Sequence, residues 1–322
     1  MSQSRNSVFE LIRIFAMIFI VLYHLLVEVY KYDPSEVVYK TAWLPLHIGV
    51  LLFVLISGYF GIKCSLKGLG KLLFAVALYY FSLLIINGKD SLSIVDCLFV
   101  SHSTYWFIRT YICLYLFSPV LNRYLEDITP RQRWTLILSL LFISVYIGTS
   151  KGDISLSDGK NLVNFSLIYV IGNTLKFYKD KYDKIPITYL LISYFMLNIF
   201  IVVIYYMFYG TSLSKVIWIL SFPYCSPLLI LNAILFFMIM SKFTLHSKLV
   251  NYIASSMLAV YLIHSHPCIA EWIKHIIIDV IYIPGNVLFT FVYLLLLTIV
   301  IIIASVVIDK VVYLLLRTIQ KR

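Results

Sequence analysis

The sequence has few charged residues: Asp, Glu, Lys and Arg make up 13% of its 322 positions, about half the share found in soluble globular domains. Apolar residues make up 61% of the chain, and the mean hydropathy is +0.94. A chain with so little polar surface cannot fold as a soluble globule. These values indicate a polytopic membrane protein, whose partner is the lipid bilayer.

The sequence also lacks the patterns that mark disulfide frameworks, metal sites and extra domains. The five cysteines have neither CxxC nor Cys/His ligand spacing, which argues against both a disulfide framework and a bound metal. There is no low-complexity tract, no convincing tandem repeat and no loop long enough for an extramembrane domain. We therefore expect a single transmembrane domain over residues 1–322.

The net charge of +11 would suggest a nucleic-acid partner in a soluble protein, but here the basic residues lie in short loops between apolar runs, and no nucleic acid is expected. With the N-terminus in the cytoplasm, seventeen of the 26 Lys and Arg residues fall on the inner side and only six on the outer side. This bias predicts an all-α bundle of about ten transmembrane helices with both termini cytoplasmic. The first apolar stretch contains charges and has no small-residue cleavage site, so we expect it to remain as a helix.

The ten expected spans come from the length criterion of about 20 mostly apolar residues. Within them, four glycines are candidate points of close helix approach: Gly49, Gly58, Gly61 and Gly172. The expected spans are 8–30, 43–62, 69–87, 105–122, 134–150, 161–178, 185–209, 216–240, 250–277 and 286–308.

The stretch 8–30 carries Arg13 and His24 inside an otherwise apolar segment. In a helix an eleven-residue step spans about 16 Å and returns to within about 20° of the same face. Ionisable residues within a span usually face a bundle interior or a water-filled cavity, so this helix is a candidate wall of a functional site. The alternative is that Arg13 snorkels to the inner surface and His24 bonds to a neighbouring helix. Glu28, one turn beyond His24, either supports that imidazole or is solvated.

Three further motifs follow in order along the chain. The second span ends in Ser57-Gly58-Tyr59-Phe60, the fourth opens with Trp106 and Phe107 and continues to a Ser-Pro pair, and the ninth contains Tyr-Leu-Ile-His ending at His264. Together with the Arg, ten residues, His pattern, these motifs resemble the acyltransferase-3 family. Its members are integral membrane proteins that move acyl groups, usually acetyl, from cytoplasmic coenzyme A thioesters to sugars of surface polysaccharides.

The resemblance implies a membrane-embedded O-acetyltransferase in a bacterial inner or cytoplasmic membrane, with acetyl-CoA as acyl donor and a glycan or lipid-linked saccharide as acceptor. It implies that His24 is the base or a transient acyl carrier and that Arg13 helps to order the donor. Further expected contacts with the acceptor are Arg109, Trp106, His264 and Glu28. Aromatic anchoring, snorkelling of Arg109 and helix packing of His264 or His266 are the alternatives.

The resemblance also places the coenzyme near Ser57 and a row of lysines, Lys63, Lys67 and Lys71, which would share one face if helical. The family often has arginines in this region, and Lys binds phosphate only as a point charge. Contact with anionic lipid headgroups is the alternative for the lysines, and close packing is the alternative for Ser57. A transporter or flippase for a polysaccharide or lipid-linked sugar is the rival function, but such proteins more often show internal repeats and paired broken helices.

Overall fold

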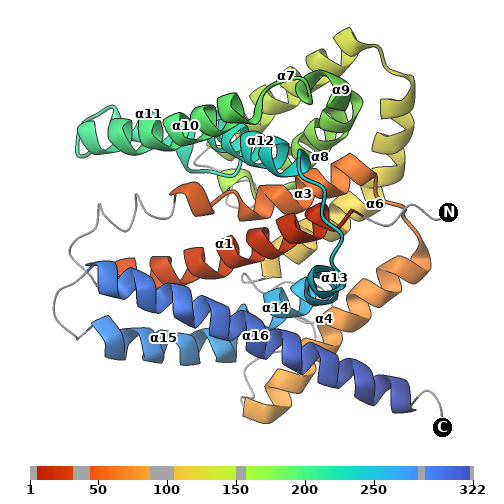
Figure 1. Ribbon diagram of the computed structural model, residues 1–322, viewed down its shortest axis with the longest axis vertical. Helices are drawn as coiled ribbons and strands as arrows, with labels where there is room; N and C mark the ends of the chain where they lie inside the picture. Colours follow the sequence, from red (N-terminus) through yellow and green to blue (C-terminus); the bar gives the residue numbers. More distant parts are fainter. Residues whose placement is uncertain (1–5, 32–43, 88–104, 150–156, 282–286, 320–322) are drawn as a thin grey trace. The chain divides into compact units, whose positions relative to one another are not determined.

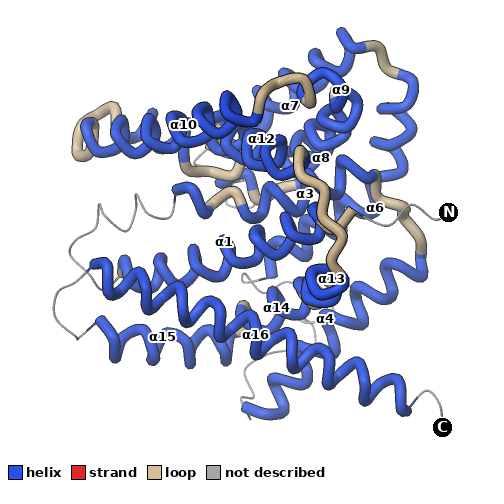
Figure 2. The backbone as a smooth tube through the Cα atoms, in the orientation of Figure 1, coloured by secondary structure: helices blue, strands red, loops and turns tan. Residues whose placement is uncertain are grey.

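The computed structural model describes residues 6–31, 44–87, 105–149, 157–281 and 287–319. Within these ranges every regular element is a helix and there is no strand (Figure 2), as the sequence predicts. The elements are α1 (Val8–Tyr30), η1 (Leu44–Leu46), α3 (Gly49–Phe60), α4 (Leu66–Asn87), α6 (Trp106–Asp127), α7 (Pro130–Gly148), η3 (Ser157–Gly159), α8 (Leu162–Phe177), α9 (Lys179–Tyr182), α10 (Ile187–Met207), α11 (Ser214–Ser221), α12 (Pro227–Ser241), α13 (Lys248–Ala254), α14 (Met257–His264), α15 (Pro267–Ile281) and α16 (Val287–Ile319).

Three helices of the described chain are long and apolar enough to cross a bilayer: Val8–Tyr30, Ile187–Met207 and Leu288–Thr318. A bent pair, Lys248–His264 and Pro267–Ile278, meets the same test as one broken span with an angle of 79°. Helices overlap all ten predicted ranges. The number of crossings and the cytoplasmic position of both termini remain predictions.

Two of the predicted spans are interrupted in the structure. The range 216–240 is divided between α11 and α12, and Pro223 and Pro227 lie at the break. Proline has no backbone N–H to continue a helix, which accounts for the interruption. The range 250–277 consists of α13, α14 and α15, with the sharp bend just before Pro267.

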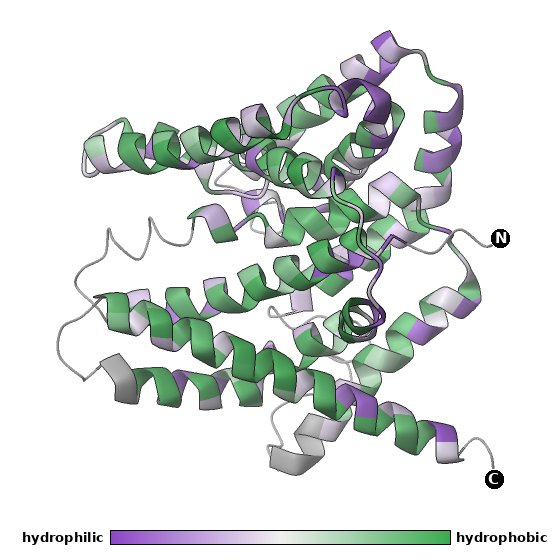
Figure 3. Cartoon of the chain, viewed as in Figure 1, coloured by the Kyte–Doolittle hydropathy of each residue, from purple (hydrophilic) through white to green (hydrophobic). Residues whose placement is uncertain are grey.

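Helices α10 and α16 are mostly apolar, as the largely green ribbon of both helices in Figure 3 shows. Only 11% of the apolar window of α10 is buried. Phe195 of α10 and Ile303 of α16 are each 58% exposed. Apolar surface of this extent is unfavourable in water but is the natural contact surface for lipid chains. These faces therefore support a membrane location.

The chain divides into two compact units, which are described separately. Unit 1 combines Met1–Trp43, Lys71–Tyr105 and Leu245–Arg322, and unit 2 combines Leu44–Gly70 and Trp106–Thr244. Unit 2 thus lies, in sequence, between the parts of unit 1.

In unit 1, α1 packs against α13, α14, α15 and α16, and Figure 1 shows α1 in red beside α16 in blue. The buried face of α1 includes Ile12 and Leu26, both fully shielded from solvent. Asp309 of α16 accepts hydrogen bonds of 2.6 Å from the Tyr79 hydroxyl of α4 and the Ser256 hydroxyl before α14. The Asp309 carboxylate therefore links α16 to α4 and to the start of α14 within unit 1.

The start of α1 is held by a polar clasp, formed by Asn6 and Ser7 on one side and Leu245 and Ser247 on the other. The Ser7 N–H donates to the Leu245 carbonyl at 2.7 Å, and the Ser247 N–H donates to the Ser7 hydroxyl at 3.1 Å. Asn6 Oδ1 accepts from the Leu245 N–H at 3.2 Å. The clasp fixes α1 to the segment that leads into α13.

In unit 2, the most extensive packing joins α3 to α8. A Cβ atom on Gly58 would lie 2.0 Å from the Tyr169 carbonyl oxygen, and one on Gly172 would lie 2.3 Å from the Leu55 carbonyl oxygen. Only glycine fits where two helix backbones approach this closely. The predicted close-approach role of Gly58 and Gly172 is confirmed. Gly61 instead ends α3 with a positive φ of 76°.

Candidate functional site

Helix α1 carries Arg13 and His24 without a break between them. Both side chains are half-buried, while their neighbours Ile12 and Leu25 are buried. The intact helix supports the predicted separation of about 16 Å along one face. Each of the two residues has a distinct partner within unit 1.

His24 lies against His264 of α14. His24 Nδ1 and His264 Nε2 are 3.1 Å apart, and the ring centroids are 5.3 Å apart. His264 is 4% exposed, and its Nδ1 lies 2.7 Å from the Val260 carbonyl oxygen one turn earlier. The structure thus brings together two of the histidines that the sequence marks as candidates.

The Val260 carbonyl determines the direction of these hydrogen bonds. A carbonyl oxygen can only accept, so His264 Nδ1 carries a proton. In the neutral ring His264 Nε2 is then an acceptor, and His24 Nδ1–H is the donor at 3.1 Å. The Ser265 hydroxyl, 3.2 Å away, also donates to His264 Nε2. A neutral His24 with its proton on Nδ1 holds its basic lone pair on Nε2.

Arg13 pairs with Glu10, one turn earlier on α1. Arg13 Nη1 lies 2.7 Å from both carboxylate oxygens, and Glu10 is 5% exposed. The Arg13 side chain retains 32% exposure. Because the carboxylate offsets the guanidinium charge, Arg13 forms part of an ion pair at the start of the apolar helix.

Glu28 and His266 occupy different surroundings. Glu28 Oε1 lies 2.5 Å from Lys31 Nζ at the end of α1. His266 is fully buried at the bend between α14 and α15, where it faces the Tyr80 ring and its Nδ1 accepts the Cys268 N–H at 3.3 Å. These contacts match the packing interpretation of His266 beside Pro267.

The remaining acceptor and donor candidates lie in unit 2, except Lys71, which belongs to unit 1. The Ser57 hydroxyl donates to the Phe53 carbonyl at 2.8 Å and lies 3.2 Å from the Tyr111 hydroxyl. The Trp106 and Tyr224 ring centroids are 5.2 Å apart with the rings tilted by 36°, and Lys160 Nζ lies 5.5 Å from the centre of the Trp106 ring. Arg109 is exposed on α6.

The three lysines do not form one helical row, because α4 begins only at Leu66. Lys63 stands in the preceding loop, where Tyr169 accepts the Ile62 N–H at 2.8 Å and Asn122 donates to the Ile62 carbonyl at 2.9 Å. Lys67 and Lys71 lie one turn apart on α4, and all three side chains are exposed. Gly61 ends α3 and the chain becomes helical again only at Leu66, so the helical spacing assumed from the sequence applies to Lys67 and Lys71 only.

A family model described as an acyltransferase domain, Acyl_transf_3, matches residues 6–310. The chain belongs to the acyltransferase-3 family. No curated protein and no solved structure matches the chain. The match spans both units and includes every predicted site residue, and it indicates that the protein is a membrane acyltransferase.

For this acyltransferase-3 protein, the sequence analysis identified neither the partner of Arg13 nor two of the partners of His264. Glu10 stands three residues before Arg13, which is the spacing of a helical ion pair and a usable signal. Ser265 and the Val260 carbonyl had no such signal, because their role depends on the orientation of the His264 ring. Among the described residues, no group of three His, Cys, Asp or Glu side chains could hold a metal ion.

Proposed function

We propose that this protein transfers acetyl from cytoplasmic acetyl-CoA to a hydroxyl of a surface or capsular polysaccharide sugar, with His24 as the base. The observation that carries this proposal is the His24–His264 pair within apolar helices. Acyl transfer to a hydroxyl needs a base active near neutral pH, and imidazole is the usual choice.

In the proposed reaction, His24 Nε2 takes the proton of the acceptor hydroxyl while the hydroxyl oxygen bonds to the thioester carbonyl carbon. The C–S bond then breaks, and the proton passes from His24 to the coenzyme sulfur, which leaves a sugar ester and a free thiol. His264 accepts the His24 Nδ1–H throughout, and the Val260 carbonyl keeps His264 in the required tautomer. His264 therefore acts as a positioning residue that also stabilises the transient imidazolium.

A second route uses the same lone pair as a nucleophile. His24 Nε2 attacks the thioester carbonyl, the C–S bond breaks, and the coenzyme leaves as the thiolate. The sugar hydroxyl oxygen then takes the acyl group from Nε2, and the hydroxyl proton neutralises the thiolate. The two routes differ in one observable, because only the second leaves label on the protein when acceptor is absent.

The donor and acceptor contacts are assigned by residue chemistry. Lys63, Lys67 and Lys71 are exposed, and none forms an ion pair within the described ranges, so their charges are available to coenzyme phosphates. We assign Ser57 to the donor side. Arg13 would contribute to donor ordering through its exposed portion.

We assign Arg109, Trp106, His264 and Glu28 to the acceptor side. Trp106 offers an aromatic surface, Arg109 a cation for acidic groups, and His264 its link to the base. The acceptor is a glycan or a lipid-linked saccharide.

The test uses purified full-length protein in liposomes with labelled acetyl-CoA on one defined side. Wild type is compared with His24→Ala, Arg13→Ala and the control His275→Ala, which removes an exposed histidine of α15. We expect His24→Ala to bind the coenzyme but lose transfer, and His275→Ala to match wild type. If wild type neither binds acetyl-CoA nor moves the label, the proposal fails and a transporter becomes the better interpretation.

A further inference from the structure

A groove of about 570 Å³ lies within unit 2, bordered by α7, α8 and α12 and by the chain around α9. Its walls include Ile137 of α7, Ile171 of α8, and Ile234 and Met238 of α12. The volume lies in the range typical of small-molecule sites, about 300–1,000 Å³. The groove is therefore large enough for an organic ligand, and its lining favours an apolar one.

A single charged residue, Lys181, lines this groove. Lys181 has no ion-pair partner among the residues that the structure describes, whereas the neighbouring Lys179 is paired with Asp183. Lys181 Nζ lies 4.9 Å from the centre of the Tyr178 ring. The lining of the groove thus includes one positive charge that has no ion-pair partner among the described residues.

Aromatic side chains stand beside that charge. The Trp134 and Tyr178 rings are stacked with centroids 6.4 Å apart, and Trp134 is 51% exposed. Trp and Tyr are enriched where membrane proteins meet the headgroup region, because each combines an apolar ring with a polar atom. The groove therefore has an apolar interior with an aromatic and cationic rim.

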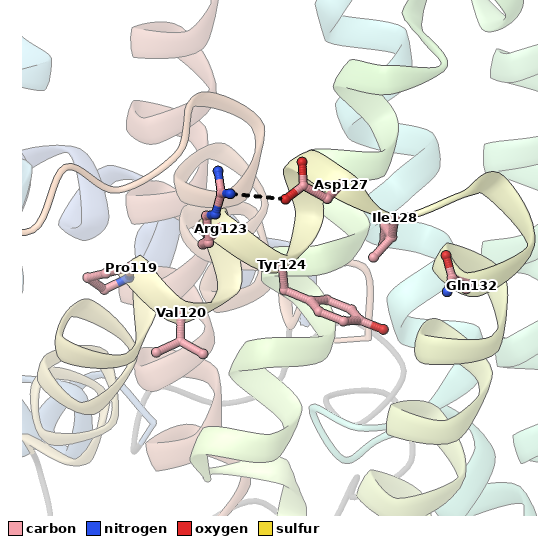
Figure 4. Close-up of a pocket in the computed structure, with 7 residues that line it drawn as sticks. All are labelled: Pro119, Val120, Arg123, Tyr124, Asp127, Ile128 and Gln132. Carbon is pink, nitrogen blue, oxygen red and sulfur yellow. Dashed lines mark ion pairs between the residues drawn. The ribbon is translucent and has the colours of Figure 1, made fainter.

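A second cavity of unit 2, of about 760 Å³, lacks this combination. Its cation, Arg123, forms an ion pair of 3.4 Å with Asp127 (Figure 4). Arg123 also contacts Glu126 at 3.3 Å. The guanidinium charge there is already offset by two carboxylates. Charge complementarity to an anion is thus a feature of the Lys181 groove.

We propose that this groove binds an anionic phospholipid, with one acyl chain between α7, α8 and α12 and the headgroup phosphate at Lys181. An acyl chain would contact these apolar walls, of which Ile234 and Met238 are partly exposed. The chain from 176 to 184 carries three further lysines, which add a general attraction to anionic headgroups. Lipid binding at this groove does not depend on the acyl-transfer proposal and is measured without it.

The experiment compares phosphatidylglycerol with phosphatidylcholine of identical chains, added to the purified full-length protein in neutral detergent. Native mass spectrometry counts the bound lipid. Lys181→Gln removes the proposed phosphate contact, and Lys184→Gln removes an exposed lysine of the same segment that does not line the groove. We expect wild type and Lys184→Gln to bind more phosphatidylglycerol than phosphatidylcholine. In Lys181→Gln the ratio of bound phosphatidylglycerol to bound phosphatidylcholine should fall about fivefold.

A second measurement locates the acyl chain. Phosphatidylglycerol with brominated chains should quench tryptophan fluorescence, and Trp134→Phe should remove most of the quenching while the other four tryptophans stay in place. If both lysine variants lose the preference for phosphatidylglycerol equally, the attraction is a diffuse surface effect and the proposed lipid site is wrong. Unchanged quenching in Trp134→Phe, or equal binding of the two lipids by wild type, would also overturn it.

Discussion

His264 Nε2 lies 3.1 Å from His24 Nδ1, and the bond from His264 to the Val260 carbonyl makes His24 the donor of that pair. His24 is thus a candidate base whose ring is oriented by a second group, His264, which accepts the proton on the nitrogen that does not react. Mutation of His264 therefore tests the proposed mechanism as directly as mutation of His24.

Replacing His264 by Ala should reduce the transfer rate about 100-fold, because His24 loses the acceptor that orients its ring and stabilises its cation. His264→Gln should retain part of the rate, since its amide oxygen can still accept the His24 Nδ1–H. Single-turnover kinetics with labelled acetyl-CoA measure both, with coenzyme binding as the control for folding. Wild-type rates in His264→Ala would show that the pair has no part in catalysis.

Removing Arg13 should destabilise unit 1 more than removing Arg13 and Glu10 together. Arg13→Ala leaves the Glu10 carboxylate, 5% exposed, without its guanidinium, whereas the double alanine variant removes both charges. We expect a coupling free energy of about 1–2 kcal/mol. A double-mutant cycle on thermal unfolding in detergent measures it, and strictly additive shifts would contradict the ion pair.

Gly58→Ala should prevent normal packing of α3 on α8, because the new methyl group would meet the Tyr169 carbonyl oxygen at 2.0 Å. We expect a loss of at least about 3 kcal/mol, comparable to the larger core-overpacking effects. Gly70→Ala is the matched control: a Cβ there meets nothing within 4 Å, and alanine favours the helix by up to about 1 kcal/mol. Unfolding midpoints should move in opposite directions, and similar midpoints would contradict the close approach.

Arg133 is 2% exposed, and its guanidinium joins the ends of two helices in unit 2. It donates to the backbone carbonyl of Leu125 at the end of α6 at 3.0 Å and to the side-chain Oδ1 of Asn173 near the end of α8 at 2.6 Å. Helix C-termini carry partial negative charge, which compensates the buried cation.

Arg133→Met should therefore lower the free energy of unfolding by about 3 kcal/mol, because the Leu125 carbonyl and the Asn173 side-chain oxygen lose their donor. Arg131→Met, at an exposed position two residues earlier, should change stability by less than about 0.5 kcal/mol. Thermal unfolding of both variants in the same detergent provides the comparison. Equal midpoints would show that Arg133 does not hold the two helix ends.

Much of the fold can be predicted from local properties of the sequence, because helices and their close contacts follow from apolar runs of about 20 residues and from the positions of single glycines. The helix α8 lies within one residue of its predicted range 161–178, and Gly58 and Gly172 lie at the predicted close approach. The divided span at Pro223 and Pro227 was missed because mean apolarity over a window hides a break of a few residues.

The sequence predicts individual residues of the candidate site but not which of them contact one another. Arg13 and His24 stand out because ionisable groups are costly in an apolar helix. The pairing of His24 with His264 depends on which helices become neighbours, and one sequence does not contain that information in its periodicity. Lys63 lies in a loop and not in the expected helix. The side chains of Tyr169 and Asn122, which are distant in sequence, bind the backbone of the preceding residue Ile62 and hold that loop.

The separation of the parts of unit 1 along the chain has a consequence for biosynthesis. Ser7 and Ser247 of the clasp, like His24 and His264, stand 240 residues apart, with the whole of unit 2 translated between them. Helix α1 therefore emerges from the ribosome long before its partners exist. The base meets its orienting imidazole only when most of the chain has been made, so a product that stops early carries His24 but not its partner.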